Sequence, residues 1–209
     1  MYGPQADTAL LAEALRDEPV PRGATVLDLG TGTGALAFAA ARRGARVTAV
    51  DVSWRAVLCT RLNARLAGLP VHVLRGNLLA PTGGRTYDLI LSNPPYVPVS
   101  SPVAPRRGAA RAWDAGRDGR LLLRRICRQA PWRLRPGGVL LLVHSGLSDS
   151  DSTLAQLRRE GLKAAVVARR YVPFGPVLRS RRASLAGQGL ITADQTMEEL
   201  VVIRAERPV

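Results

Sequence analysis

Residues 27–37 read "LDLGTGTGALA" and join an apolar segment to a run of small residues. The preceding "ATVLDLG" is typical of a buried β-strand, and the alanine-rich sequence that follows is typical of a helix ending near Gly44. Gly30, Gly32 and Gly34 stand between the two. Because glycine adopts positive φ and lets the backbone approach a ligand closely, this stretch predicts a strand–turn–helix unit that binds a ligand at the turn.

Strand-like and helix-like segments alternate over the rest of the chain. Further strands are expected at 45–51, 71–77, 87–93, 137–145, 162–170 and 198–206. Further helices are expected at 5–17, at 53–68 with Ser53 as N-cap, within 118–138, and at 150–161 with a cap near Ser150. Residues 171–196 are rich in arginine and are expected to be irregular.

This alternation predicts an α/β fold, with a largely parallel, Rossmann-like seven-stranded sheet and helices on both faces. Residues 1–209 are expected to form a single domain, because no linker divides the chain. Ligands of such sheets bind beyond the carboxyl ends of the strands. The unusual polar residues Asp28, Asp51, Asn77 and Asn93 all stand at predicted strand ends, which makes that edge the expected binding edge.

Two acids indicate which ligand the turn holds. Asp51 ends the second strand, 21 residues after Gly30, where a carboxylate can accept hydrogen bonds from both hydroxyls of a ribose. Asp28 precedes the turn and favours a cationic ligand over a pyrophosphate. S-adenosylmethionine (SAM) carries an ammonium and a sulfonium and is the favoured ligand. A nicotinamide dinucleotide fits less well, because Ala35 replaces the third glycine of GxGxxG, and a turn that only packs helix on strand is the remaining alternative.

The stretch "LSNPPYVP", Leu91–Pro98, supplies the second half of the expected site. Pro94 and Pro95 fix φ and hold the preceding residues extended, so the carbonyls of Asn93 and Pro94 point in fixed directions. Together with the Asn93 side-chain oxygen they can accept both hydrogens of a planar NH2 group, and Tyr96 can stack on it. Holding the hydrogens directs the nitrogen lone pair at the methyl group. The alternative is a proline-rich strand exit with an Asn turn.

Composition limits where the protein acts. Of 209 residues, 46% are hydrophobic, and 30 basic against 16 acidic residues give a formal charge of +14. That charge suggests nucleic acid, the ribosome or another acidic partner, or else a solvated surface, since the arginine pairs are scattered. Cys59 and Cys127 lack a metal-binding spacing, so no metal is expected. With no signal peptide and no long apolar run, a cytoplasmic protein without a membrane contact is expected.

Several conspicuous side chains have simpler explanations. His72 and His144 are expected to be structural, and Trp54 and Trp132 are expected to pack in the interior. Trp113 is either a lid or a core residue. Asp114 and Asp118 are expected to be loop caps.

The combination resembles the class I SAM-dependent methyltransferases that carry an NPPY motif. "YGPQADTALLAEAL", Tyr2–Leu15, is similar to the N-terminal signature of HemK-type protein-glutamine methyltransferases, and "RAWDAGRDGRLLLRRI", Arg111–Ile126, is similar to the segment that follows NPPY there. The short eukaryotic and archaeal branch of that family is the most similar. Asn77 in place of the usual acid, and "DAG" at 114–116, depart from the family pattern.

The resemblance implies a set of roles. Asn93, Pro94 and Tyr96 would hold the acceptor amide, and the helix in residues 1–20 would pack on the cofactor site. Residues 97–115 would form a substrate loop. The residues that would contact SAM, and S-adenosylhomocysteine after transfer, are Thr8, Asp28, Gly30, Gly32, Gly34, Asp51, Val52, Asn77, Leu78 and Asn93.

The implied acceptor is the glutamine of the Gly-Gly-Gln loop of a class I peptide release factor, and a small zinc-binding activator subunit is a further implied partner. An amino methyltransferase acting on adenine or cytosine in nucleic acid is the main alternative, although no target-recognition domain is visible. A small-molecule methyltransferase, and a SAM-binding module without catalysis, are the others.

Overall fold

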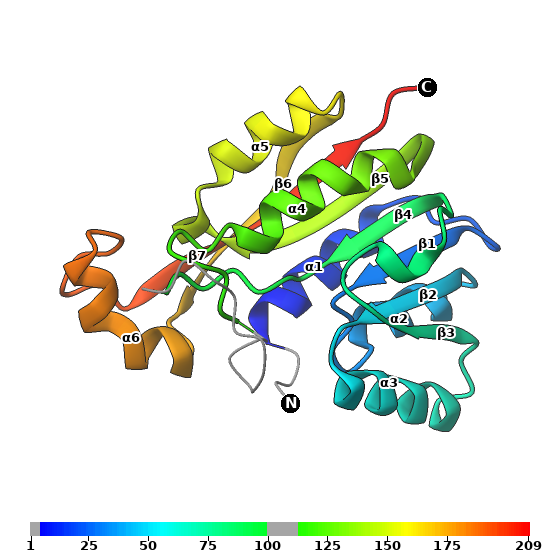
Figure 1. Cartoon of the computed structure of the whole chain (residues 1–209), viewed down its shortest axis with the longest axis horizontal. Coiled ribbons are helices and arrows are strands. Elements are labelled where there is room, and N and C mark those ends of the chain that lie inside the picture. Colours follow the sequence, from blue (N-terminus) through cyan, green and yellow to red (C-terminus); the bar gives the residue numbers. More distant parts are fainter. Residues whose placement is uncertain (1–4, 100–112) are drawn as a thin grey trace.

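A seven-stranded sheet forms the centre of the protein (Figure 1). The computed structural model describes residues 5–99 and 113–209. The strand order is β3-β2-β1-β4-β5-β7-β6, and β7 runs antiparallel to both of its neighbours while the other pairs are parallel. The strands are β1 (Thr25–Leu29), β2 (Arg46–Asp51), β3 (Val71–Arg75), β4 (Tyr87–Ser92), β5 (Leu134–Ser145), β6 (Lys163–Pro173) and β7 (Met197–Glu206). The expected α/β class and the largely parallel sheet are confirmed.

Helices cover both faces of the sheet, as expected. One face carries α1 (Ala6–Asp17), α2 (Ala35–Arg42) and α3 (Trp54–Leu66). The other carries α4 (Leu121–Gln129) and α5 (Ser150–Arg159). A further helix, α6 (Pro176–Gly187), projects beyond the end of the sheet (Figure 1). Short 3-10 turns lie at Ala80–Thr82, Ala130–Arg133 and Gly146–Ser148.

The alternation of side chains along each strand divides the core in two. Val26 and Leu91 contribute to the layer beneath α1, α2 and α3, whereas Leu27 and Ile90 contribute to the layer beneath α4 and α5. Successive residues of a strand point to opposite faces, so a strand covered on both sides must be apolar almost throughout. This requirement explains why the central strands could be recognised in the sequence.

The connection from β3 to β4 is unusual for this architecture. Parallel strands are normally joined through a helix that covers one face of the sheet. Between Arg75 and Tyr87, a segment that the structure describes throughout, the only helical element is the 3-10 turn Ala80–Thr82. The face of β1, β2 and β3 opposite α2 and α3 therefore carries no helix from this connection.

The expectation that residues 171–196 are irregular is wrong. It contains the end of β6 and the whole of α6. Pro176 starts the helix at a position where a missing amide hydrogen is harmless. Leu178 and Leu185 lie two helical turns apart and are buried in a small separate core with Phe174. The three arginines of α6 hid this sparse apolar face from a reading of the sequence.

Smaller differences concern element ends. Asp149, not Ser150, caps α5, with its side chain accepting a hydrogen bond from the Ser152 amide. Ser53 caps α3 as expected. The fifth strand begins at Leu134, three residues before the expected start. Within residues 5–99 and 113–209, no helix is both long and apolar enough to cross a membrane.

Candidate active site

The glycine turn between β1 and α2 lies directly beside the strand that delivers the NPPY motif. Gly30 has φ of +77°, which other residues rarely adopt, and its amide donates to the Val50 carbonyl at 2.9 Å. A Cβ added at Gly30 would lie 3.8 Å from the Asn93 carbonyl oxygen. The expected cofactor turn and the expected acceptor group are therefore adjacent.

Asp28 is a strongly perturbed acid beside the glycine turn. Its side chain is buried, and Oδ2 accepts hydrogen bonds from Thr31 Oγ1 at 2.6 Å and from the Ala37 amide at 3.1 Å. Burial raises the pKa of Asp28 to about 6, against the lowering effect of those two hydrogen bonds. Among the described residues Oδ1 has no partner. A buried oxygen without a donor is costly, and a cationic ligand group would satisfy it.

Asp51 is held rigidly at the end of β2. Oδ2 accepts from the Gly32 amide at 3.0 Å and Oδ1 from the Ser53 amide at 2.8 Å. Each carboxylate oxygen keeps a second lone pair. The carboxylate can therefore accept hydrogen bonds from a ribose without moving, and the ribose contact itself stays a prediction.

Helix α3 supports the same turn from behind, which the sequence did not reveal. Thr60 Oγ1 donates to the Gly32 carbonyl at 3.0 Å, and Asn63 Nδ2 donates to the Thr33 carbonyl at 3.1 Å. These two side chains hold carbonyls of the turn, so the conformation of the turn depends on the position of α3. Nothing in the local pattern distinguishes them from ordinary helix residues.

The remaining expected cofactor residues lie on the same edge. Val52 follows Asp51 and is partly exposed, while Asn77 and Leu78 follow β3. Leu78 has φ of +52°, an uncommon conformation for a residue with a side chain. Backbone held in this way occurs often at ligand sites. The roles of these three residues stay predictions.

The NPPY motif is fixed from α1. Asn93 Nδ2 donates to Thr8 Oγ1 at 3.0 Å, which leaves Asn93 Oδ1 to accept from a ligand. The Tyr96 hydroxyl donates to Asp7 Oδ2 at 2.9 Å, and Asp7 Oδ1 accepts from the Thr8 amide at 2.6 Å. The Asp7 carboxylate thus holds Tyr96 of the motif directly and holds Asn93 through Thr8. Asp7 stands in the N-terminal signature, but sequence analysis gave it no role.

The Tyr96 main chain is held as well. Its carbonyl accepts from Ser148 Oγ at 2.8 Å. Gly119 approaches the same carbonyl so closely that an added Cβ would come within 2.2 Å. Sequence analysis also missed Ser148.

Only the two ends of the expected substrate loop, 97–115, lie within the described residues; 100–112 lie outside them. The ends pair with each other: the Val97 amide donates to the Trp113 carbonyl at 2.8 Å, and the Ala115 amide donates to the Val97 carbonyl at 3.1 Å. Trp113 is half-buried against the small core that α6 completes. Asp114 forms an ion pair with Arg181 of α6 at 2.6 Å, so it is more than a loop cap.

Known proteins share this sequence and fold. The methyltransferase small domain family matches residues 4–103. A Methanocaldococcus jannaschii protein named as a protein N5-glutamine methyltransferase is 34% identical over 175 residues, which cover 83% of this chain and 87% of that relative. The chain belongs to the protein N5-glutamine methyltransferase family. The resemblance inferred from the motifs is thereby confirmed.

Bacterial relatives of the chain are longer. The release factor glutamine methyltransferase of Deinococcus radiodurans is 41% identical over 163 residues, and that of Gloeobacter violaceus is 45% identical over 130 residues. These alignments cover 75% and 57% of this chain, but only 57% and 45% of the relatives. The chain therefore spans about half the length of these two enzymes.

Solved structures show the same fold. The E. cuniculi Mtq2 protein, in a complex with Trm112 that methylates the termination factor eRF1, has a TM-score of 0.69 at 24% identity, and the match covers 99% of this chain and 98% of that one. RsmC of T. thermophilus, a 16S rRNA methyltransferase bound to AdoMet and guanosine, has a TM-score of 0.62 at 26% identity, over 98% of this chain and 44% of that one.

Two buried ionisable groups, Glu198 and His144, both contact Ser145 at the end of β5. Burial raises the pKa of Glu198 to about 7; a hydrogen bond with Ser145 opposes that rise and the nearby charge of Asp7 adds to it. Its Oε2 has no partner among the described residues. Burial lowers the pKa of His144 to about 4, so this histidine is neutral at pH 7, which agrees with a structural role.

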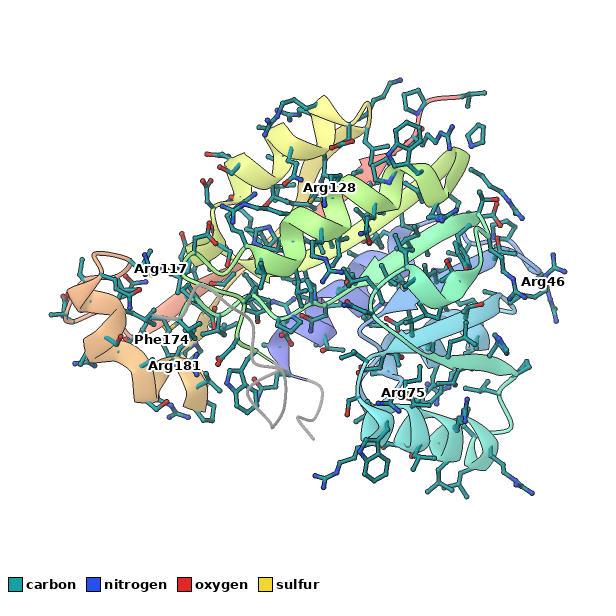
Figure 2. All side chains as sticks on the ribbon, in the orientation of Figure 1. Arg46, Arg75, Arg117, Arg128, Phe174 and Arg181 are labelled. Atoms are coloured by element: carbon teal, nitrogen blue, oxygen red, sulfur yellow. The ribbon has the colours of Figure 1, made fainter. Side chains whose placement is uncertain are left out.

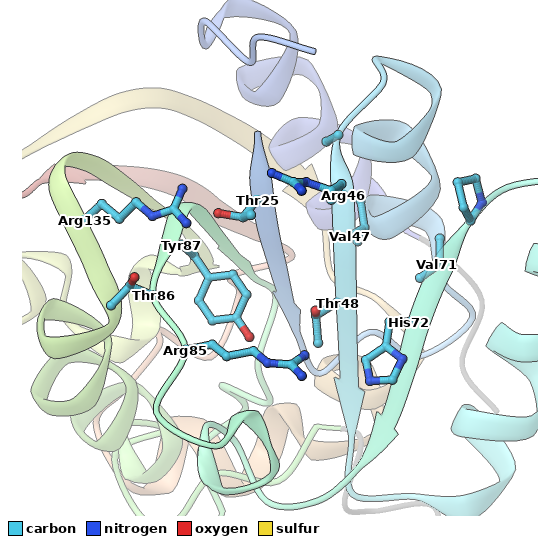
Figure 3. Close-up of a pocket in the computed structure, with 12 residues that line it drawn as sticks. Thr25, Arg46, Val47, Thr48, Val71, His72, Arg85, Thr86, Tyr87 and Arg135 are labelled. Atoms are coloured by element: carbon cyan, nitrogen blue, oxygen red, sulfur yellow. The ribbon is translucent and has the colours of Figure 1, made fainter. Parts of the chain in front are cut away.

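The cavity in Figure 3 is not part of the methyltransferase site. It has a volume of about 760 Å³ and lies at the amino ends of the strands, where Arg46, His72, Arg85 and Tyr87 line it. The glycine turn and Asn93 lie at the carboxyl ends. The cavity is the consequence of the short β3–β4 connection, and it places His72 away from the chemistry.

The arginines of the protein are widely dispersed. Figure 2 shows Arg46, Arg75, Arg117 and Arg128 at distant parts of the surface. Within the described part of the chain, no group of three or more histidine, cysteine or acidic side chains could hold a metal ion. Trp54 and Trp132, expected in the interior, are 53% and 72% exposed, so that expectation is wrong.

Proposed function

We propose that this protein transfers the methyl group of SAM to the side-chain amide nitrogen of a glutamine in a class I peptide release factor. The observation that carries the proposal is the arrangement of Asn93. Its Nδ2 is tied to Thr8, its Oδ1 remains available, and its carbonyl lies beside Gly30. A planar NH2 group bound there would lie next to the cofactor turn.

The residues at the cofactor edge suit SAM. Asp28, with one buried oxygen lacking a donor, would hold the ammonium, and Asp51 would hold the ribose hydroxyls. Bound SAM supplies a methyl group on a positively charged sulfur, which leaves as a neutral thioether. The positive charge of the SAM sulfonium therefore favours a site that contains carboxylates and lacks competing cations.

The acceptor nitrogen needs orientation because its lone pair is delocalised into the amide. Asn93 Oδ1 and the Pro94 carbonyl accept its two hydrogens, and the proline rings keep these acceptors from turning away. The lone pair then points at the methyl carbon. Alignment of this kind contributes part of the roughly 7–11 kcal/mol available from proximity and orientation. The surplus proton leaves the nitrogen after the new bond to carbon has formed.

The proposed release-factor acceptor also indicates a partner and a compartment for this protein. The structural likeness to Mtq2, which extends over nearly all of both chains, supports a small activator subunit as a partner here. Since release factors act in translation, we place the protein in the cytoplasm. The formal charge of +14 and the likeness to RsmC favour a second candidate, methylation of an exocyclic amine in RNA.

The test incubates the purified protein and labelled SAM with each of four acceptors in parallel. These are a class I release factor, the same factor with its Gly-Gly-Gln glutamine replaced, ribosomal RNA, and DNA. Label on the intact factor alone is expected. An Asn93→Ala variant should lose transfer while still binding SAM, and a variant of the exposed Asn77, Asn77→Ala, should keep transfer at higher SAM concentration. Label on RNA with none on the factor would replace this function with the second candidate.

A further inference from the structure

Arg120 is the only buried arginine within residues 5–99 and 113–209. It is 5% exposed and stands directly before α4, after the expected substrate loop. Its Nη1 donates to the Ser148 carbonyl at 2.6 Å, to Thr153 Oγ1 at 2.9 Å and to the Asp149 carbonyl. Burying a charge costs free energy unless polar groups surround it, and here three acceptors from one segment do so. The guanidinium therefore ties the start of α4 to the turn before α5, the helix beside it (Figure 1).

The turn that Arg120 holds also holds the NPPY motif. Ser148 is fully buried, and its Oγ donates to the Tyr96 carbonyl at 2.8 Å, while its own carbonyl is the one that accepts from Arg120. A continuous chain of contacts thus runs from Arg120 through Ser148 to the backbone of Tyr96. A displacement of Ser148 would move the main chain that carries the two prolines of the motif.

Asp149, the residue after Ser148, shows that this turn is held under constraint. Its φ is +58°, which is uncommon for a residue with a side chain. Its carbonyl accepts from Arg120 and from Thr153 Oγ1, and its side chain caps α5. Such a backbone conformation persists only where surrounding contacts enforce it, and it is frequent at functional sites. Without the guanidinium, the turn would be free to relax and to carry Ser148 away from Tyr96.

Gly119, the residue before Arg120, serves the same contact in a different way. Its φ is +69°, and an added Cβ would lie 2.2 Å from the Tyr96 carbonyl oxygen and 2.6 Å from Ser148 Oγ. A side chain at this position would therefore occupy the space of the hydrogen bond between Ser148 and Tyr96. Two consecutive residues act on one hydrogen bond, since Gly119 leaves room for it and Arg120 fixes its donor.

We infer that Arg120 is a positioning residue for methyl transfer, which acts through Ser148 on the Tyr96 carbonyl. The segment fixed in this way includes Asn93 and Pro94, whose oxygens would accept the hydrogens of the acceptor amide. The effect on the rate rests on the proposed function, whereas the hold on Tyr96 does not. None of the hydrogen bonds of Arg120 reaches the glycine turn, so SAM affinity should not depend on it.

The rate test compares arginines at two positions near the same helix. Arg120→Met removes the donors, so the single-turnover rate at saturating acceptor should fall about 10–100-fold, as for a small misplacement of the reacting groups, with SAM affinity unchanged. Arg120→Lys should lie nearer the parent, because one nitrogen makes all three contacts and an ammonium has three hydrogens to donate. The matched control is Arg128→Met, which removes an exposed arginine of α4 and should react like the parent (Figure 2).

A second measurement follows Tyr96 itself and needs no acceptor. The protein contains four tyrosines, so tyrosine labelled with carbonyl 13C gives four signals, and Tyr96→Phe identifies the one from Tyr96. The shift of a carbonyl carbon responds to the hydrogen bonds that the carbonyl accepts. Ser148→Ala and Arg120→Met should therefore both move this signal in the same direction. If the parent labels no acceptor, the proposed function fails, while this signal still decides whether Arg120 holds the motif.

The two substitutions should not act independently. Arg120→Met/Ser148→Ala should transfer no more slowly than Arg120→Met alone, because both break the same chain of contacts. Should Arg120→Met fail to fold, Arg120→Gln replaces it, since the two hydrogens of an amide leave one of the three acceptors without a donor. The inference is overturned if the losses of the single variants multiply in the double variant, if the Tyr96 signal stays in place without the Arg120 guanidinium, or if Arg128→Met loses as much transfer.

Discussion

At the scale of single residues, Asp7 organises the acceptor site, although the sequence did not predict that it contacts SAM or the acceptor amide. It accepts hydrogen bonds from Tyr96 and from the Thr8 amide, and Thr8 in turn holds Asn93. Asp7→Ala should therefore lower the rate of methyl transfer by about 10–100-fold, as for loss of a positioning group. SAM affinity should change much less.

The control for Asp7 is Asp17→Ala, which removes an exposed acid from the other end of the same helix. Single-turnover transfer and equilibrium SAM binding would be measured for both variants. Equal loss of transfer in the two would mean that α1 tolerates no change, and Asp7 would have no special role.

Asp28 gives the site a pH dependence. Its pKa in the folded protein is raised to about 6, so its charge is lost below that pH and gained above it. A cationic ligand should bind more tightly as the pH rises through 6. Calorimetric SAM titrations between pH 5 and 8 should show this rise in the parent protein, with weaker and nearly pH-independent binding by Asp28→Asn. A parent protein whose SAM affinity is flat over this range would show that Asp28 does not face the ligand.

Glu198 should affect stability in the opposite direction from an ordinary surface acid. Because its pKa is raised from 4.5 to about 7 in the folded state, the folded protein holds a proton that the unfolded chain has released. Stability therefore falls as the pH rises from 4.5 to 7. Glu198→Gln, which stays neutral, should melt at a higher temperature than the parent at pH 8, by roughly 2–4 °C for each kcal/mol gained.

The same two proteins should melt within about one degree of each other at pH 4.5, where the parent Glu198 is also neutral. A Glu198→Gln variant that is less stable at pH 8 would show that the charged form is favoured by the fold. Differential scanning calorimetry at the two pH values makes the comparison.

At the scale of elements, α6 attaches to the acceptor loop through one ion pair and one small core. Arg181 and Asp114 are both largely shielded from solvent, and Leu178 packs with Val97, the residue after the NPPY motif. Arg181→Asp should place like charges together and raise the KM for the acceptor by about tenfold. SAM affinity should stay the same, because α6 does not contact the glycine turn.

A charge reversal tests this pair directly. Asp114→Arg/Arg181→Asp restores opposite charges and should recover most of the lost acceptor affinity, as in a double-mutant cycle. Arg179→Asp, an exposed neighbour on the same helix, is the matched control and should behave like the parent. If the double variant is no better than Arg181→Asp, the pair does not position the loop.

The elements differ in how far the sequence could predict them. The strands were recognisable because burial on both faces demands continuous apolar runs such as "VLLLV". Helix α6 was not, since Leu178 and Leu185 are its only fully buried side chains and arginines surround them. Among site residues, Asn93 and Asp51 were predictable from strand ends, whereas Asp7, Thr60 and Ser148 act through contacts between segments distant in the sequence.

At the scale of the whole molecule, one sheet edge collects the chemistry and other surfaces carry separate features. Asp28, Asp51 and Asn93 meet at the carboxyl ends of β1, β2 and β4, while the cavity beneath the short β3–β4 connection lies at the amino ends. The dispersed arginines explain why net charge alone did not identify the partner (Figure 2).

The central claim is that the acceptor is a glutamine side chain held by Asn93. The most direct measurement is peptide-resolved mass spectrometry of a class I release factor after incubation with the protein and SAM. One methyl group on the side-chain nitrogen of the Gly-Gly-Gln glutamine is predicted, absent when Asn93→Ala replaces the parent enzyme. An unmodified glutamine, under conditions where the protein binds SAM and methylates RNA, would contradict the claim.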